Sequence, residues 1–165
     1  MVEVVDNFLD PNHLQQLKMA VFGGAFPWYM QKSVAYDDES MENDNLYMLA
    51  HGVYKNSEVA SKDMFEFIKG AVFPKLDMIA PLRIKINQYP YTEKLYEHPL
   101  HYDQKYSNKA LVLCLNTCNG YTHFENGDKV DSVENRAIFF DGSKLHGSTN
   151  CSDQKCRIVL AMNYV

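Results

Sequence analysis

Two C-terminal stretches carry the strongest strand pattern, residues 136–149, RAIFFDGSKLHGST, and residues 155–165, KCRIVLAMNYV. Each contains a run of apolar residues of strand length, and Asp141-Gly142 makes a turn inside the first. Residues 110–116, ALVLCLN, are apolar almost throughout, as in a core strand that is covered on both faces. We therefore predict strands in all three stretches.

Shorter strands and tight turns surround these stretches. Residues 83–91, RIKINQYPY, alternate basic or polar side chains with apolar ones, which is a strand pattern, and Pro90 ends the run. Residues 119–124, NGYTHF, contain a turn and a short strand. Residues 125–130, ENGDKV, follow with an Asn-Gly pair of the kind that tightens hairpins.

The N-terminal half contains helical signals. A short strand is predicted over residues 2–8, and a helix then begins with Asp10 as N-cap and Pro11 at its first position. Leucine and valine recur at helical spacing until Gly23-Gly24 ends this helix.

Ser57 is predicted to cap a second helix that runs to about Lys69, and a third helical stretch is predicted over residues 72–79. The inner face of the second helix is expected to carry Val59, Met64, Phe65 and Ile68. Before it, two extended segments are expected around residues 37–44, which carry five Asp or Glu and no basic residue. A solvated loop is the simplest interpretation of this acidic run, and a lid or substrate-contacting loop is the functional one.

Helices followed by many short strands with tight turns is the order of an α+β protein. The strand half suits a double-stranded β-helix, the cupin-like jelly roll, with the N-terminal helices packed on one sheet. Since 165 residues correspond to one domain, we expect a single domain over residues 1–165. Residues 1–82 would form N-terminal strands and helices, and residues 83–165 the jelly-roll core.

Composition restricts the class of protein. The net charge is −5, from 16 Lys and Arg against 21 Asp and Glu, and no run is rich in basic residues. This argues against sequence-blind binding of nucleic acids or anionic membranes. The N-terminus has neither a basic region nor a long apolar run, so we expect a soluble, cytoplasmic protein that does not bind a membrane.

Four cysteines, at positions 114, 118, 151 and 156, do not have the spacing of a paired CxxC zinc site. In a protein without a secretory signal, reduced thiols are the expected state. A disulfide or a metal cluster stays open as the alternative.

His101-Tyr102-Asp103 places a histidine and an aspartate two residues apart. In an extended strand such side chains point to one face, so a single strand end can offer an imidazole and a carboxylate to one ion. His146, in a later strand, would supply a second imidazole. Two histidines and one carboxylate leave open positions on Fe(II) and are typical of non-haem iron oxygenases.

Arg157 stands inside the apolar run of residues 156–162. Burial of a guanidinium is costly without a partner, and its planar fork matches a carboxylate in a bidentate manner. An anionic ligand in the barrel would offset this cost. The structural alternative is an acidic side chain paired with Arg157.

The block from Arg83 to the C-terminus resembles the catalytic core of the Fe(II)- and 2-oxoglutarate-dependent dioxygenases. Their pattern runs through a strand with a Tyr, H-x-D, a Gly-x-Thr-x-Phe strand, an apolar strand that ends in a turn, a His and an Arg. The matching residues here are Tyr89, His101, Asp103, Gly120-Tyr121-Thr122-His123-Phe124, residues 137–140, His146 and Arg157. The chain is most similar to small prolyl-4-hydroxylase-like and phytanoyl-hydroxylase-like members, including single-domain ones carried by phages and marine bacteria.

The resemblance implies that His101, Asp103 and His146 are the catalytic residues and hold Fe(II). It implies 2-oxoglutarate and O2 as co-substrates, with ascorbate as a further candidate cofactor. Halogenating members replace the carboxylate ligand with a small residue, so Asp103 points to hydroxylation or oxidative demethylation.

Three residues are expected to bind the co-substrate by the same resemblance. Arg157 would pair with the distal carboxylate of 2-oxoglutarate, and Tyr89 and Asn87, two residues apart, would hydrogen-bond the co-substrate. Val159 stands where several relatives carry a Ser or Thr for the same carboxylate. Residues 162–164, MNY, stand where nucleic-acid dealkylases carry a second Arg, which argues against a nucleic-acid substrate.

The expected substrate is a peptide, with proline as the first candidate, or a small molecule. Two other functions stay open, a cupin-type metal-binding jelly roll with different chemistry and a non-catalytic barrel that binds a ligand or partner. Cupins usually carry more histidines and a Glu, and do not need Arg157. Of the other histidines, His98 is expected on the opposite strand face from His101, and His123 is expected to form a polar wall of the pocket.

Overall fold

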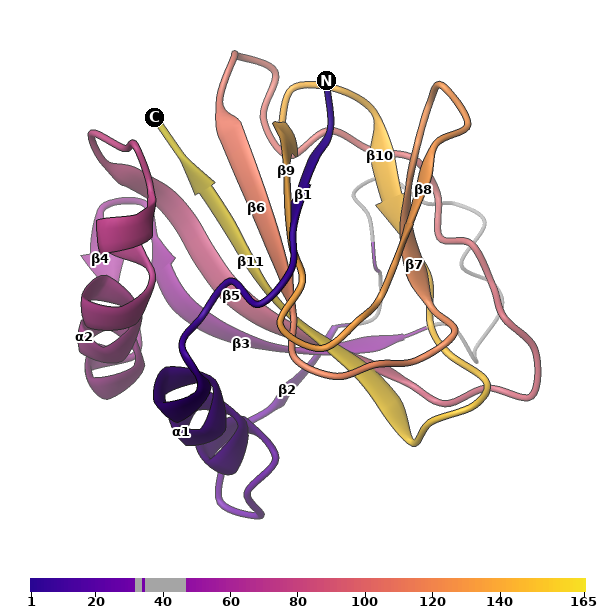
Figure 1. Cartoon of the computed structure of the whole chain (residues 1–165), viewed down its shortest axis with the longest axis horizontal. Coiled ribbons are helices and arrows are strands. Elements are labelled where there is room, and N and C mark those ends of the chain that lie inside the picture. Colours follow the sequence, from indigo (N-terminus) through magenta and orange to yellow (C-terminus); the bar gives the residue numbers. More distant parts are fainter. Residues whose placement is uncertain (32–33, 35–46) are drawn as a thin grey trace.

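The computed structural model describes residues 1–31, 34 and 47–165. Two antiparallel sheets face each other in it, and two helices lie on the outer side of the larger sheet (Figure 1). This is the α+β jelly-roll architecture predicted from the sequence. No helix among the described residues is long and apolar enough to cross a membrane.

Among the described residues the larger sheet has eight strands, and β11 (Cys156–Tyr164) lies at its centre between β5 (Pro81–Pro90) and β6 (Lys109–Cys114). The other strands continue outward from β5 and β6. They are β3 (Met48–Lys55), β2 (Tyr29–Gln31) and β4 (Glu58–Val59) on the β5 side, and β9 (Ala137–Asp141) and β1 (Glu3–Val5) on the β6 side. Since β3 pairs with β5, strands from both halves of the chain build one sheet.

The smaller sheet has the order β10 (His146–Ser148), β7 (Tyr121–Phe124) and β8 (Lys129–Asp131). The hairpin between β7 and β8 turns at Gly127, whose φ of 88° is accessible to glycine without strain. The predicted Asn-Gly turn is therefore confirmed. The smaller sheet lies opposite the inner face of the larger one (Figure 1).

The outer face of the larger sheet carries the main hydrophobic core. Alternate residues of the central strands point to this face, and α1 (Pro11–Val21) and α2 (Lys62–Ala71) cover it. Its fully buried side chains include Leu17, Ile68, Ile84, Ile86, Leu111, Leu113, Ile158 and Leu160. Each such side chain stabilises the fold by roughly 1.5–3 kcal/mol. Because this core lies on the outer face of the sheet, the inner face can carry polar groups.

The first helix begins as predicted. The Asp10 carboxylate accepts a hydrogen bond from the backbone N–H of His13 at 3.1 Å, and Pro11 occupies the first helical position. The strand before it is shorter than predicted, Glu3–Val5 rather than residues 2–8. Asn7 has a φ of 54°, which turns the chain toward the helix.

The predicted cap at Ser57 is wrong. Asn56 and Ser57 both have positive φ, 54° and 63°, and form the turn of the β3–β4 hairpin. The helix begins only after Ser61, and Val59 lies in β4 and is 46 % exposed rather than on an inner helical face. Met64 and Ile68 are buried as predicted.

The third predicted helical stretch, residues 72–79, is only a 3₁₀ turn, η1 (Phe73–Lys75). Pro74 disfavours helical backbone at the residue before it and lacks an N–H, which prevents a longer helix from forming here. The acidic run 37–44 lies outside the described residues.

Candidate functional site

A pocket opens on the inner face of the larger sheet, between this sheet and the smaller one. The strands β5 and β11 supply most of its polar floor, since Lys85, Asn87 and Tyr89 alternate along β5 and Arg157 stands beside Tyr89. All six residues that the sequence predicts for metal and co-substrate binding line this pocket. They are His101, Asp103, His146, Arg157, Tyr89 and Asn87.

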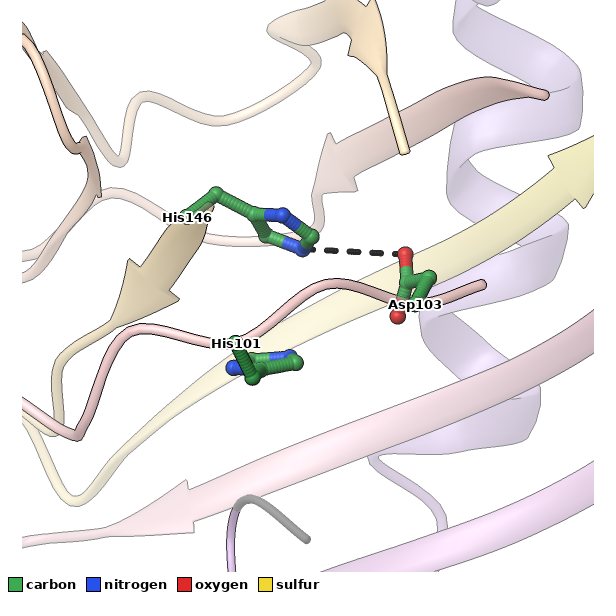
Figure 2. Close-up of side chains that lie close together, drawn as sticks. All are labelled: His101, Asp103 and His146. Atoms are coloured by element: carbon green, nitrogen blue, oxygen red, sulfur yellow. Dashed lines mark ion pairs between the residues drawn. The ribbon is translucent and has the colours of Figure 1, made fainter. Parts of the chain in front are cut away.

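His101, Asp103 and His146 converge at one end of the pocket (Figure 2). One ligand atom of each lies within 4.8 Å of the other two, and His146 Nε2 is 3.6 Å from Asp103 Oδ2. The backbones of the two histidines exchange N–H···O bonds, each 2.9 Å long. His101 makes only this isolated bridge, so the pair does not lie at the end of a regular strand as predicted, although the two side chains converge with His146.

The tautomers of the two imidazoles suit metal binding. Nδ1 of His146 lies 2.9 Å from the carbonyl oxygen of Lys144, and Nδ1 of His101 lies 3.3 Å from that of Pro99. Because a carbonyl can only accept, Nδ1 carries the proton, and the lone pair of Nε2 is left for an ion. Burial, with a contribution from the neighbouring imidazole, lowers the pKa of His101 to about 4, and burial also lowers that of His146. Both rings are therefore neutral near pH 7, as metal ligands must be.

Asp103 is oriented by residues that sequence reasoning missed. Its Oδ1 accepts a hydrogen bond from the Arg83 guanidinium, and its Oδ2 accepts one from Asn163 Nδ2 at 2.8 Å. Burial alone would raise the pKa of this carboxyl, but the positive charge of Arg83 and the hydrogen bond from Asn163 lower it overall. Asp103 is therefore ionised and held in one orientation.

The donor set fits a non-haem Fe(II) ion. Two imidazole nitrogens and one carboxylate are the protein ligands of the facial triad, and this triad leaves positions open for other ligands. The histidine carbonyl contacts and the Arg83–Asp103 pair are the outer contacts that such ligands need.

Arg157 lies at the other end of the pocket and is fully buried, with 0 % of its surface exposed. Its Nε donates to Ser132 Oγ at 3.3 Å, and its two terminal nitrogens donate at 3.1 Å to Thr149 O and Thr122 Oγ1. All three acceptors are neutral, and the described part of the chain supplies no carboxylate partner for Arg157. The alternative in which an acidic side chain pairs with Arg157 therefore finds no support among these residues.

Tyr89 and Asn87 stand between Arg157 and the triad. The Tyr89 ring centroid is 5.6 Å from the Arg157 guanidinium carbon, and its hydroxyl lies 3.3 Å from Asn87 Nδ2. The Asn87 side-chain oxygen is buried without a hydrogen-bond partner among the described residues. A buried polar atom of this kind costs free energy unless a ligand or water pairs with it.

Two other histidines lie close to the pocket. His98 is buried, contacts Ser148 Oγ at 2.9 Å and is not part of the triad. His123 was expected to form a wall of the pocket, and this is wrong. Thr122 faces the pocket, so its neighbour His123 points away, with its Nε2 3.1 Å from the His98 carbonyl oxygen.

Comparison with solved structures identifies the fold. The chain is similar to a viral collagen prolyl hydroxylase of Paramecium bursaria Chlorella virus-1, with 16% identity and a TM-score of 0.57 over 99% of this chain and 96% of that one. It is similar to a 2OG-Fe(II) oxygenase family oxidoreductase of Burkholderia pseudomallei, with 10% identity and a TM-score of 0.69 over 99% and 84%.

A third similar structure is a prolyl hydroxylase of Trichoplax adhaerens in complex with a hypoxia inducible factor peptide, with 12% identity and a TM-score of 0.65 over 99% and 82%. No family model and no curated protein matches the sequence. The chain therefore has the fold of the prolyl hydroxylases and 2OG-Fe(II) oxygenases, and the predicted resemblance is confirmed at the level of the fold.

Proposed function

We propose that this protein is an Fe(II)- and 2-oxoglutarate-dependent dioxygenase that hydroxylates a C–H bond of a peptidyl or small-molecule substrate. The observation that carries the proposal is the buried Arg157 guanidinium, which faces the same pocket as the triad and has only neutral partners among the described residues. A cupin with other chemistry would not need an unpaired cation at this depth, and the intact triad beside Arg157 argues against a barrel without catalytic activity. The fold of the neighbours adds support.

His101, Asp103 and His146 would hold the iron through their Nε2 and carboxylate oxygen atoms. With 2-oxoglutarate bound, this iron would activate O2, release CO2 and succinate and oxidise a substrate C–H bond. The protein side chains keep the imidazoles neutral and the carboxylate ionised, so no proton has to leave before the metal binds.

Arg157 would bind the distal carboxylate of 2-oxoglutarate as a bidentate ion pair. The three neutral acceptors around it fix the guanidinium in place, which lowers the entropy that ligand binding costs. Asn87 and Tyr89 would contact the co-substrate along the pocket. Because 2-oxoglutarate offers only acceptors, Asn87 Nδ2 and the Tyr89 hydroxyl would be the groups that donate to it, and the unpaired Asn87 oxygen would accept from water or substrate.

A peptidyl substrate, with a prolyl residue as first candidate, is favoured by the segment next to the triad. Leu100, Tyr102 and Tyr106 flank His101 and Asp103 and are 40 %, 42 % and 53 % exposed. Exposed aromatic side chains close to a site are typical of peptide contacts. The presence of the Asp103 carboxylate favours hydroxylation over halogenation.

The test is turnover of 2-oxoglutarate in the presence of Fe(II), O2 and ascorbate. Succinate release should be measurable for the parent protein and should increase with a true substrate, for which prolyl peptides are the first set to screen. His146→Ala should abolish it, whereas His13→Ala, which changes a half-exposed histidine of α1, should not. Equal succinate release by the parent protein and His146→Ala would overturn the proposal.

A further inference from the structure

A second group of metal-ligating side chains lies outside the pocket, where the β6–β7 connection meets the β10–β11 connection. Cys118, Cys151 and Asp153 each offer one ligand atom, and these three atoms lie within 4.8 Å of one another. Both thiols are buried, Cys118 at 6 % and Cys151 at 0 % exposure, and the Asp153 carboxylate is exposed at the rim.

Hydrogen bonds hold the two connections together. The backbone N–H of Asn119 donates to the Asp153 carboxylate, with both oxygens at 3.0 Å. The Asn119 side chain donates to Ser152 Oγ at 2.8 Å and accepts from Ser152 N at 3.0 Å. The three ligand atoms are thus positioned by the fold itself, so little conformational entropy has to be lost when an ion binds.

The two thiols are hydrogen-bonded to each other. A hydrogen bond from the Cys151 thiol and one from the Gly120 N–H lower the pKa of Cys118, with a further contribution from the Arg157 charge. The Cys151 thiol donates this hydrogen bond, and the bond together with burial raises the pKa of Cys151. A divalent cation bound by both sulfurs would take the place of the proton between them, and thiolates are the form in which cysteine binds metals.

We propose that Cys118, Cys151 and Asp153 form a binding site for a thiophilic divalent cation such as Zn²⁺, separate from the His101–Asp103–His146 site. Two thiolates and one carboxylate are within the normal ligand set of zinc, and a water molecule completes the four-coordinate shell on the exposed side. The spacing of the cysteines in the sequence does not indicate this site. Its two thiols are 33 positions apart, and each has a cysteine nearer in the sequence that is not a ligand.

The site borders the Arg157 end of the pocket. Ser132 Oγ accepts the hydrogen bond from Arg157 Nε, and the carbonyl oxygen of Ser132 accepts one from the backbone N–H of Cys118 at 3.1 Å. The proposed site therefore lies next to a residue that positions Arg157, although neither Cys118 nor Cys151 lines the pocket.

Titration with Co²⁺ under anaerobic, reducing conditions tests this proposal independently of any catalytic activity. Sulfur-to-cobalt charge transfer gives intense near-ultraviolet bands, whereas a site made of imidazole and carboxylate gives none. We expect the parent protein to show these bands, and their intensity to saturate at one thiolate-bound Co²⁺ per protein molecule. Zn²⁺ should displace this Co²⁺ and remove the bands. His146→Ala, which disables only the triad, should keep them.

Cys151→Ser should lose at least half of the band intensity, and Cys114→Ala, which changes a buried cysteine in β6, should leave it intact. Because Cys151 is fully buried, Asp153→Asn serves as a second variant at an exposed position. It should weaken Co²⁺ binding about tenfold or more. Absence of sulfur bands in the reduced parent protein, or their persistence in Cys151→Ser, would overturn the proposal, as would a Cys118–Cys151 disulfide that forms in place of metal binding.

Discussion

Replacing Arg157 with methionine distinguishes a ligand-binding role of this side chain from a structural one. Methionine has a similar length and fills irregular core space, so the packing of the pocket floor is largely kept. In the metal-free protein, the change removes three hydrogen bonds to neutral acceptors, worth about 1 kcal/mol each. It also removes a fully buried charge, whose desolvation costs several kcal/mol.

These two effects oppose each other, so the free energy of unfolding of metal-free Arg157→Met should lie within about 2 kcal/mol of the parent value. The affinity for 2-oxoglutarate should change much more. Loss of one partner of a buried, hydrogen-bonded charge pair costs about 2–5 kcal/mol, which corresponds to a roughly 30- to 5,000-fold increase in Kd.

The assays are urea denaturation of the metal-free protein and anaerobic calorimetry of 2-oxoglutarate binding to the Mn²⁺-loaded protein. Arg136→Met is the matched control, because this arginine pairs with Asp6 outside the pocket and should leave the Kd unchanged. A strongly destabilised Arg157→Met protein with unchanged 2-oxoglutarate affinity would refute the reasoning, since Arg157 would then be a structural residue.

Three further outcomes are expected. Arg83→Met should weaken Mn²⁺ binding about 10- to 100-fold in calorimetry, because Asp103 loses the group that orients it; an unchanged affinity would contradict this role. The pKa of His101 is lowered from 6.5 to about 4, so between these values the unfolded chain binds a proton that the folded chain does not. Urea titrations of the metal-free protein should therefore show stability falling as the pH drops from 6.5 to 4, with a shallower fall in His101→Gln. Gly120→Ala should lower the thermal midpoint and weaken 2-oxoglutarate binding, since the added Cβ would meet the backbone oxygen of Asn150 and, at 2.7 Å, Arg157 Cδ; parent-like values for both would show that this close approach is not needed.

The central strands, the candidate metal ligands and Arg157 follow from sequence patterns, whereas Tyr89 and Asn87 were predicted from the resemblance to the 2-oxoglutarate-dependent dioxygenases. The apolar run of residues 156–162 predicts β11. Arg157 is the charged residue inside this run, and it indicates a functional role because burial of an unpaired charge is costly. Tyr89 and Asn87 share a strand face through the period of two. Such signals lie within one strand, so a single sequence contains them.

The residues that were missed depend on pairing between distant strands. Arg83 and Asn163 stand opposite each other in the β5–β11 register, and only this register brings both to Asp103. The strand register also decides which side chain of β7 faces the pocket. A shift of one residue would point His123 into the pocket in place of Thr122. No local pattern contains this information.

The misplaced helix cap has a local cause. Serine is favoured at helix N-caps and also in turns, so its presence at position 57 does not distinguish the two. The pairing of β3 with β4 decides between them, and it places Ser57 in a hairpin turn.

The most direct test of the proposed function is an anaerobic titration of the purified protein with Fe(II) and then with 2-oxoglutarate, followed in the visible range. Chelation of the iron by the keto acid should produce a weak metal-to-ligand charge-transfer band that saturates with 2-oxoglutarate and is absent in His146→Ala. Iron binding without this band at any 2-oxoglutarate concentration would contradict the assignment of the co-substrate, and failure to bind iron would contradict the triad itself.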